Sequence, residues 1–294
     1  STDASVAIVD EKTGMTEVIG FGQGAITAWY SGRIAMARLT SPWPNKIPTE
    51  VYTKSDQTNL IDRHVIAQLR QLNLKPSPTC TDSEFIRRMY LDVIGVLPTP
   101  KETRDFLANK AKHKRAKLVD QLLARPEFVD YWTYRWADMF LISGKKLRPN
   151  ALKAYYQWLR GEIAKNTHWD QLVRQVLTAR GDSMENGATN FYAIHQEPET
   201  MAENVSQAFM SLSIGCAKCH NHPLEKWTND QYYAFANLFA QVRVKGWGGD
   251  ARNGDGKRTL FVAARGDLRQ PRTGKPQLPA PLDGKAINDP QTDR

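Results

Sequence analysis

The spacing of apolar residues changes near residue 57, and this change constrains the fold more than any other feature of the chain. Apolar side chains then recur three or four positions apart, which is the spacing of one face of an α-helix. The first two faces comprise Leu60, Ile61, Val65, Ile66, Leu69 and Leu72, then Phe85, Ile86, Met89, Tyr90, Val93 and Ile94. Further helices are predicted at about 113–125, 127–142, 150–164, 169–178, 199–214 and 229–239. The chain is therefore predicted to be mainly α, with these Met and aromatic side chains in its core.

Three motifs predict where helices begin. Thr81 with Glu84, and Thr228 with Gln231, have the spacing of a capping box, in which two side chains satisfy the free N–H groups of a first turn. Residues 99–102 (TPKE) add proline at the first helical position, where a missing N–H costs nothing.

The first forty residues are instead typical of short strands, at 6–9, 16–19, 25–30 and 33–40, separated by glycine-containing turns. So few residues rarely form a stable core unaided. Residues 1–41 are therefore predicted to be the end of a small β-sandwich whose opening strands precede this chain. Residues 42–56, which begin with two closely spaced prolines, are predicted to be a linker.

Composition narrows the functional classes. Hydrophobic residues make up 41% of the 294 positions, which is enough for a core and excludes general disorder. No run of eighteen uncharged apolar residues is present, so no membrane span is predicted. The net charge of +9 is spread without a nucleic-acid recognition motif, so nucleic acid is not an expected partner. Residues 246–294 are predicted to form an irregular, basic, solvated tail with local strand order only around 258–263.

The functional site is expected at residues 216–220 (CAKCH), which have the sequence to which a c-type haem is attached. Two thiols three positions apart on a helical turn can reach the two vinyl groups of one porphyrin, and His220 can then ligate the iron. One covalently bound haem c is therefore predicted on Cys216, Cys219 and His220.

Other interpretations of this motif remain open. A zinc site could use Cys216, Cys219, His220 and His222, but structural zinc sites draw their second ligand pair from a separate element. A redox dithiol is usually found at the N-terminus of a helix, whereas a helix is predicted to run into this motif from upstream. A disulfide between the two cysteines would close a very small loop and leave His220 unexplained.

A second iron ligand is harder to predict, because all seven methionines precede Cys216 and no histidine follows His222. His195 is favoured, since the predicted loop at 190–195 is long enough to reach the far face of the haem and neutral imidazole is a strong iron ligand. The alternatives are Met184, Met89, Met139, His64, a residue of a missing domain, or an open coordination site.

Several segments together resemble the planctomycete cytochrome c-like domain family over about residues 57–245. They are 85–99 (FIRRMYLDVIGVLPT), 114–123 (KRAKLVDQLL), 202–207 (AENVSQ), 216–223 (CAKCHNHP), 227–228 (WT) and 230–233 (DQYY). Residues 1–41 resemble the end of a bacterial group 2 immunoglobulin-like domain. Residues 270–285 resemble the stretch that precedes a second large planctomycete domain. The resemblance implies a haem-carrying part of a longer exported protein.

The predicted function is electron transfer by an extracytoplasmic monohaem c-type cytochrome domain in the periplasm or at the cell surface, where haem is attached to such motifs. A redox partner protein is expected, which the residues do not identify, together with a C-terminal domain of the same precursor. One alternative is a binding or structural module of a surface-associated assembly for polymer degradation or adhesion. The other is a haem enzyme with an open iron site.

Overall fold

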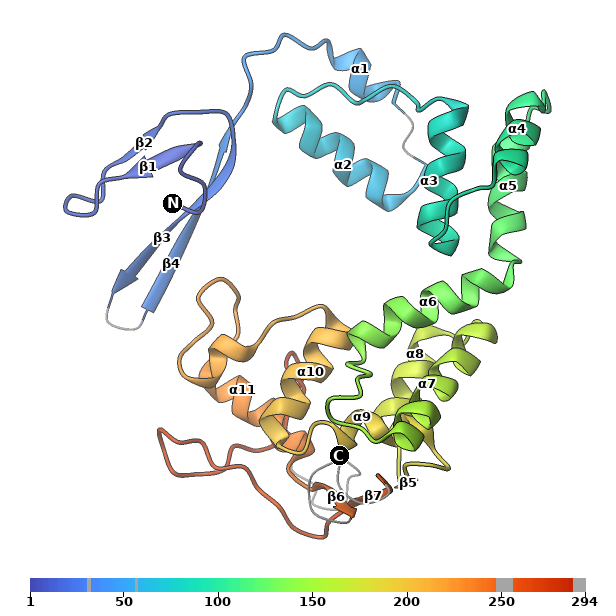
Figure 1. Ribbon diagram of the computed structural model, residues 1–294. Coiled ribbons are helices and arrows are strands. Elements are labelled where there is room, and N and C mark those ends of the chain that lie inside the picture. The colour runs from blue at the N-terminus through green and yellow to red at the C-terminus, as the bar shows by residue number, and fades with distance from the viewer. Residues whose placement is uncertain (31–32, 56–57, 247–255, 288–294) are drawn as a thin grey trace. The chain divides into compact units, whose positions relative to one another are not determined.

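The computed structural model describes residues 1–30, 33–55, 58–246 and 256–287 (Figure 1). The described chain is mainly α, with small antiparallel sheets, as predicted. Contacts divide the chain into two compact units, one of residues 1–80 with 223–226 and one of residues 81–222 with 227–294. None of the helices in the described ranges combines the length and the apolar character needed to cross a bilayer.

The first unit contains the predicted strands. They form two hairpins, β1 (Ala7–Val9) with β2 (Thr16–Val18), and β3 (Gly22–Tyr30) with β4 (Arg33–Ser41). Strand β3 begins three residues earlier than predicted, because Gly22, Gln23 and Gly24 pair with the end of β4 rather than forming a turn. The two hairpins support the predicted β character, while the immunoglobulin-like identity stays a prediction.

Two helices complete this unit, α1 (Thr49–Thr53) and α2 (Leu60–Gln71), of which only α2 was predicted. Part of its predicted apolar face is exposed to solvent, because Leu60, Ile61 and Val65 are 61%, 72% and 49% exposed. Helical spacing shows that side chains share a face, but it does not show that another element covers that face.

The second unit begins with α3 (Asp82–Ile94), α4 (Pro100–Ala108), α5 (Lys114–Leu123) and α6 (Pro126–Met139). The capping box predicted at Thr81 is formed, and α4 begins at Pro100 as predicted, with a capping box between Thr99 and Glu102. These helices enclose one apolar cluster, which consists of Ile86, Tyr90, Ile94, Phe106, Leu118 and Leu122. Helix α6 continues from this cluster into a larger core.

The larger core is built on α7 (Pro149–Ala164), α8 (Trp169–Leu177), α9 (Asn190–Ala193), α10 (Pro198–Met210) and α11 (Asn229–Ala236). Short 3₁₀ turns η1 (Gly187–Thr189), η2 (Gly215–Lys218) and η3 (Asn237–Phe239) connect them. An antiparallel sheet borders it, in the order β5 (Gly181–Asp182), β7 (Arg258–Val262) and β6 (Val242–Gly246). The fully buried side chains here include Phe140, Tyr155, Leu159, Met201 and Tyr232.

Two helical predictions need correction. The helix predicted at 199–214 ends at Met210, because Ser211 adopts the left-handed conformation (φ 55°) and the Leu212 N–H then bonds the Ser206 carbonyl. The loop predicted at 190–195 is instead the short helix α9, and its residues are buried in the core.

The predicted tail also differs from the expectation of a solvated segment. Its strand is present as β7, which pairs with β6 and with β5. Beyond it, Gln270 and Leu282 are buried, and the Ala280 N–H bonds the Ala234 carbonyl of α11 at 3.1 Å. The described part of the tail, 256–287, is therefore irregular but packed, and it contributes to the surroundings of α11.

Candidate functional site

The cysteine motif begins on the turn η2 and continues two residues beyond it, between α10 and α11 in the chain (Figure 1). Cys216 lies on the turn, and Cys219 is the residue directly after it. Both are free thiols exposed to solvent. Ala217 between them is fully buried and fixes the other side of the turn in the core. The predicted helix running directly into the motif is replaced by this separate turn.

A buried asparagine on α11 holds the turn in place. The Asn229 side-chain amide donates to the carbonyls of Ala217 and Lys218 at 2.8 and 2.9 Å. Its backbone N–H donates to the Asn221 side-chain oxygen at 3.0 Å. Because α11 begins at the predicted Thr228 capping box, the sequence that starts this helix also positions the asparagine that binds the motif.

A second layer of polar contacts supports Asn229 and the turn. Gln270 from the tail is fully buried, and its amide donates to the Asn229 side-chain oxygen at 2.6 Å. The Tyr233 hydroxyl donates to the Lys218 carbonyl at 3.3 Å, and burial raises the pKa of that hydroxyl. The neighbouring Tyr232 hydroxyl donates to the Glu203 carboxylate on α10 at 2.6 Å. The motif backbone is thus anchored while its cysteine side chains face outward.

His220 is exposed and its ring is oriented by one hydrogen bond. Its Nδ1 lies 2.8 Å from the Asn221 carbonyl oxygen, which can only accept. The Nδ1 atom therefore carries the proton, and the lone pair of the neutral ring is on Nε2. Metal-ligating histidines are commonly held in this way, with the second ring N–H bound to a carbonyl.

The other candidate ligands are not gathered around His220. The described parts of the chain contain no group of three or more His, Cys, Asp or Glu side chains placed to hold a metal ion. The half-buried His222 uses its backbone N–H to bond the Trp227 carbonyl at 2.7 Å. The four residues of the zinc interpretation therefore do not form a ready tetrahedral set.

His195 lies in a different environment from the motif. It is 2% exposed, and its ring packs edge-on against Phe191 with centroids 5.3 Å apart. The Asn204 amide donates to Nδ1 at 3.3 Å, so the neutral ring carries its proton on Nε2, which is buried without a hydrogen-bond partner among the described residues. Burial, with a smaller contribution from Lys146, lowers the pKa of His195 to about 4.

This low pKa predicts that stability falls in mild acid. The unfolded chain protonates His195 below its ordinary pKa of 6.5, whereas the folded chain does not until about 4. The contribution of His195 is therefore complete above pH 6.5 and is lost as the pH falls toward 4, by about 2 kcal/mol between pH 7 and 5. Urea unfolding of the haem-free chain at pH 7 and pH 5 measures this change in the free energy of unfolding. The change should be about 2 kcal/mol smaller in the His195→Gln variant than in the wild type, and unaltered in the exposed-site variant His113→Gln. The same change in all three proteins would contradict the assignment to His195.

The anchoring role of Asn229 predicts a large loss of stability on truncation. The Asn229→Ala variant removes the side-chain donor of the Ala217 carbonyl, and it removes one of two side-chain partners from the Lys218 carbonyl and from the buried Gln270 amide. We expect a loss of about 2–4 kcal/mol in the free energy of unfolding, measured by urea titration. Asn150→Ala, on the exposed first turn of α7, should change stability by less than about 0.5 kcal/mol. A similar small effect at both positions would contradict the anchoring role.

The sequence predicted the motif residues but missed the residues that hold them. Asn229 and Gln270 are ordinary polar residues far apart in the chain, and nothing in their local sequence signals that they meet under the turn. Only the capping box at Thr228 indicated a helix beginning directly after the motif.

Comparisons with known proteins agree on the family and add nothing on activity. No curated protein and no solved structure matches the chain. The model of the PSCyt2 family, described as a protein of unknown function (DUF1549), matches residues 60–244, close to the predicted range of 57–245. This match includes the cysteine motif, its anchor Asn229 and His195. Since it spans more than half of the chain, the chain belongs to the PSCyt2 family.

Proposed function

We propose that this chain is an extracytoplasmic monohaem c-type cytochrome domain that transfers electrons. The observation that carries the proposal is the combination at residues 216–220. Two free, exposed thiols stand three positions apart in the chain, and the adjacent His220 has its Nδ1 bound at 2.8 Å to a carbonyl. Each thiol can add across one vinyl group of haem, and the Nε2 lone pair of His220 can bind the iron.

The residues fit this group in three respects. The thiols are accessible, which attachment requires, and the motif backbone is anchored by Asn229, so the sulfur positions are held by the fold. The ring of His220 is in the tautomer that an iron ligand needs. When bound, the haem would supply one-electron redox chemistry, and the exposed position of the motif would bring it within reach of a partner protein.

His195 is the proposed second ligand that would hold the haem iron, and its support is an Nε2 atom that is buried without a hydrogen-bond partner among the described residues. Ligation would require the ring proton to move from Nε2 to Nδ1, away from the present arrangement with Asn204. A His195→Ala variant of the haem-carrying chain should change from a low-spin to a high-spin ferric spectrum. An unchanged low-spin spectrum rejects His195, and a wild type that is already high-spin and binds cyanide rapidly favours an open, enzyme-like site.

The location follows from the attachment chemistry, because haem is joined to such motifs outside the cytoplasm. Residues 1–41 are proposed to be the end of an immunoglobulin-like domain, supported by their two antiparallel hairpins. A chain extended upstream should show slower amide exchange in β1 and β3 than this chain does. Equal exchange in both would reject the proposed sandwich.

The function is tested by producing the chain in a host that attaches haem outside the cytoplasm. The denatured protein, treated with alkaline pyridine and reduced, should show the absorption bands of covalently bound haem c. Absence of these bands, in a host that attaches haem to a control cytochrome, would reject the proposal.

A further inference from the structure

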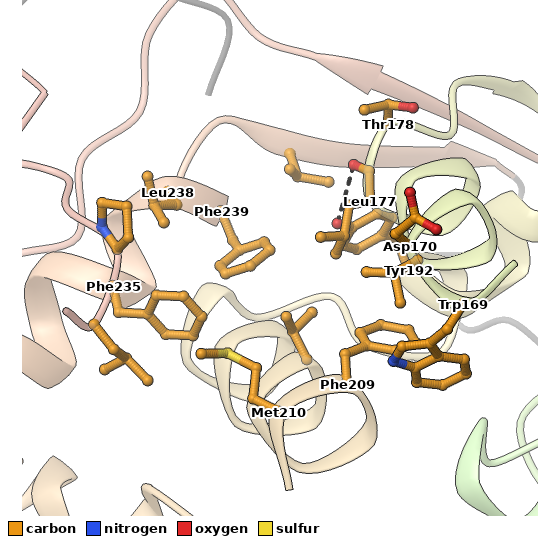
Figure 2. A pocket seen from close by; sticks show the side chains of 15 residues that line it. Trp169, Asp170, Leu177, Thr178, Tyr192, Phe209, Met210, Phe235, Leu238 and Phe239 are labelled. Carbon is orange, nitrogen blue, oxygen red and sulfur yellow. Dashed lines mark hydrogen bonds between the residues drawn. The ribbon is translucent and has the colours of Figure 1, made fainter. Parts of the chain in front are cut away.

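An apolar cavity of about 630 Å³ lies within the second unit, apart from the cysteine motif. Its fifteen lining side chains come from α8, α9, α10, α11, η3, β6 and the tail (Figure 2). Phe235 and Phe239 lie on one side of the hollow, and Leu177 and Tyr192 lie on the other (Figure 2). None of the lining residues belongs to the motif at 216–220 or is His195.

The walls of this cavity are held by contacts that need no ligand. The tail residue Leu282 is buried, and its carbonyl accepts from the Gln231 side chain on α11 at 3.4 Å. On the opposite wall, the Tyr192 hydroxyl donates to the Leu177 carbonyl at 3.3 Å (Figure 2). The cavity is therefore formed in advance, which lowers the entropy that binding would cost.

The residues that line the cavity indicate the polarity and charge of the ligand that it would bind. Most of the surface is aromatic or aliphatic, and among the described residues the only charged one in the lining is Asp170, at the exposed start of α8 (Figure 2). No lysine, arginine or histidine from the described part of the chain lines the cavity. A carboxylate or sulfonate would meet the negative charge of Asp170 without a cation to balance it, so anionic lipophiles are disfavoured.

The size of the cavity fits a small molecule. Ligand pockets typically measure about 300–1,000 Å³, and the volume of about 630 Å³ lies within that range. The cavity is also open to solvent along part of its lining. Trp169, Leu177 and Met210 remain 40%, 37% and 42% exposed.

We propose that this cavity between α8, α10, α11 and the tail binds a neutral or cationic lipophilic small molecule, with its polar end at Asp170. The apolar body would displace weakly held water from the aromatic walls. This site is separate from the motif and does not depend on the proposed haem.

The test uses Nile red, a neutral lipophilic dye, in equilibrium dialysis of the whole chain, so that attached haem does not disturb the readout. The wild type is expected to bind Nile red with micromolar affinity and to bind the anionic dye anilinonaphthalene sulfonate at least about tenfold more weakly. Val173→Trp, which fills the cavity from α8, should weaken Nile red binding at least about tenfold. Val65→Trp, the matched change on α2 outside the cavity, should leave it unchanged. Asp170→Asn should strengthen binding of the anionic dye but not of Nile red.

Several results would overturn the proposal. They are no Nile red binding by the wild type, equal binding by the Val173→Trp variant, or an anionic dye that binds as well as Nile red. Loss of binding in a chain extended beyond residue 294 would mean that a following segment covers the cavity. Loss of binding only when haem is attached would assign the cavity to the haem. A wild-type dimer that Val173→Trp converts to a monomer would assign it to a second copy of the chain. Equal dissociation constants with and without haem support the proposal, whether or not the electron-transfer function is correct.

Discussion

Replacing both Cys216 and Cys219 with alanine is expected to abolish covalent haem completely. Each thioether forms when a cysteine S–H adds across a vinyl C=C bond of the porphyrin, so removal of both sulfur atoms leaves no point of attachment. Each single variant should retain at most one link. After denaturation and removal of free haem, the double variant should show no pyridine haemochrome absorption, whereas the wild type should show about one haem per chain.

The third cysteine provides the control for this experiment. Cys80 lies outside the motif and outside the turn η2, so the Cys80→Ala variant should carry as much covalent haem as the wild type. If the double variant kept its haem through denaturation, attachment at this motif would be wrong.

Replacing His220 with alanine is expected to have the second-largest effect. Both cysteines would remain, but the proposed haem iron would lose the imidazole whose Nδ1 is held by the Asn221 carbonyl. Without this ligand we expect a much lower yield of attached haem and the loss of any low-spin ferric spectrum in the haem that remains. The absorption spectrum of the purified oxidised protein measures both effects.

The neighbouring histidine separates ligation from a general disturbance of the loop. His222 is two residues beyond His220 and half-buried, and its backbone N–H bonds the Trp227 carbonyl. A His222→Ala variant keeps that backbone bond and should keep the wild-type spectrum. Equal spectral changes in the two variants would show that His220 has no special role.

Features set by neighbouring residues were predicted well from the sequence. The capping boxes at Thr81, Thr99 and Thr228 all form, because their hydrogen bonds join residues only three positions apart. The helices of the second unit were placed within a few residues for the same reason, since their apolar spacing is a local signal.

Features that depend on distant contacts were not predicted. The exposed face of α2 and the buried Gln270 show that spacing and composition do not determine which neighbour covers a side chain. Helix α10 ends just before Ser211, which adopts the left-handed conformation. This end could not be predicted, because the usual signal for such a position is a glycine. The apolar cavity could not be foreseen either, because its walls come from residues as far apart as Trp169 and Leu282.

For the candidate site, the sequence supplied the reacting groups and the structure supplied their support. Cys216, Cys219 and His220 are recognisable from spacing alone. The tautomer of His220 and the anchoring of the turn by Asn229 depend on hydrogen bonds that only the folded structure reveals. The structure also shows that His195 is buried rather than in an open loop.

The most direct measurement is the mass of the peptide that carries the motif. Cleavage after glutamate should release residues 204–225 as one peptide, because Glu203 and Glu225 flank the motif and no glutamate lies between them. From the chain produced in a haem-attaching host and denatured before digestion, we predict that this peptide is heavier by the mass of one haem and that no other peptide is. An unmodified peptide 204–225, or haem on any other peptide, would contradict the proposed cytochrome function.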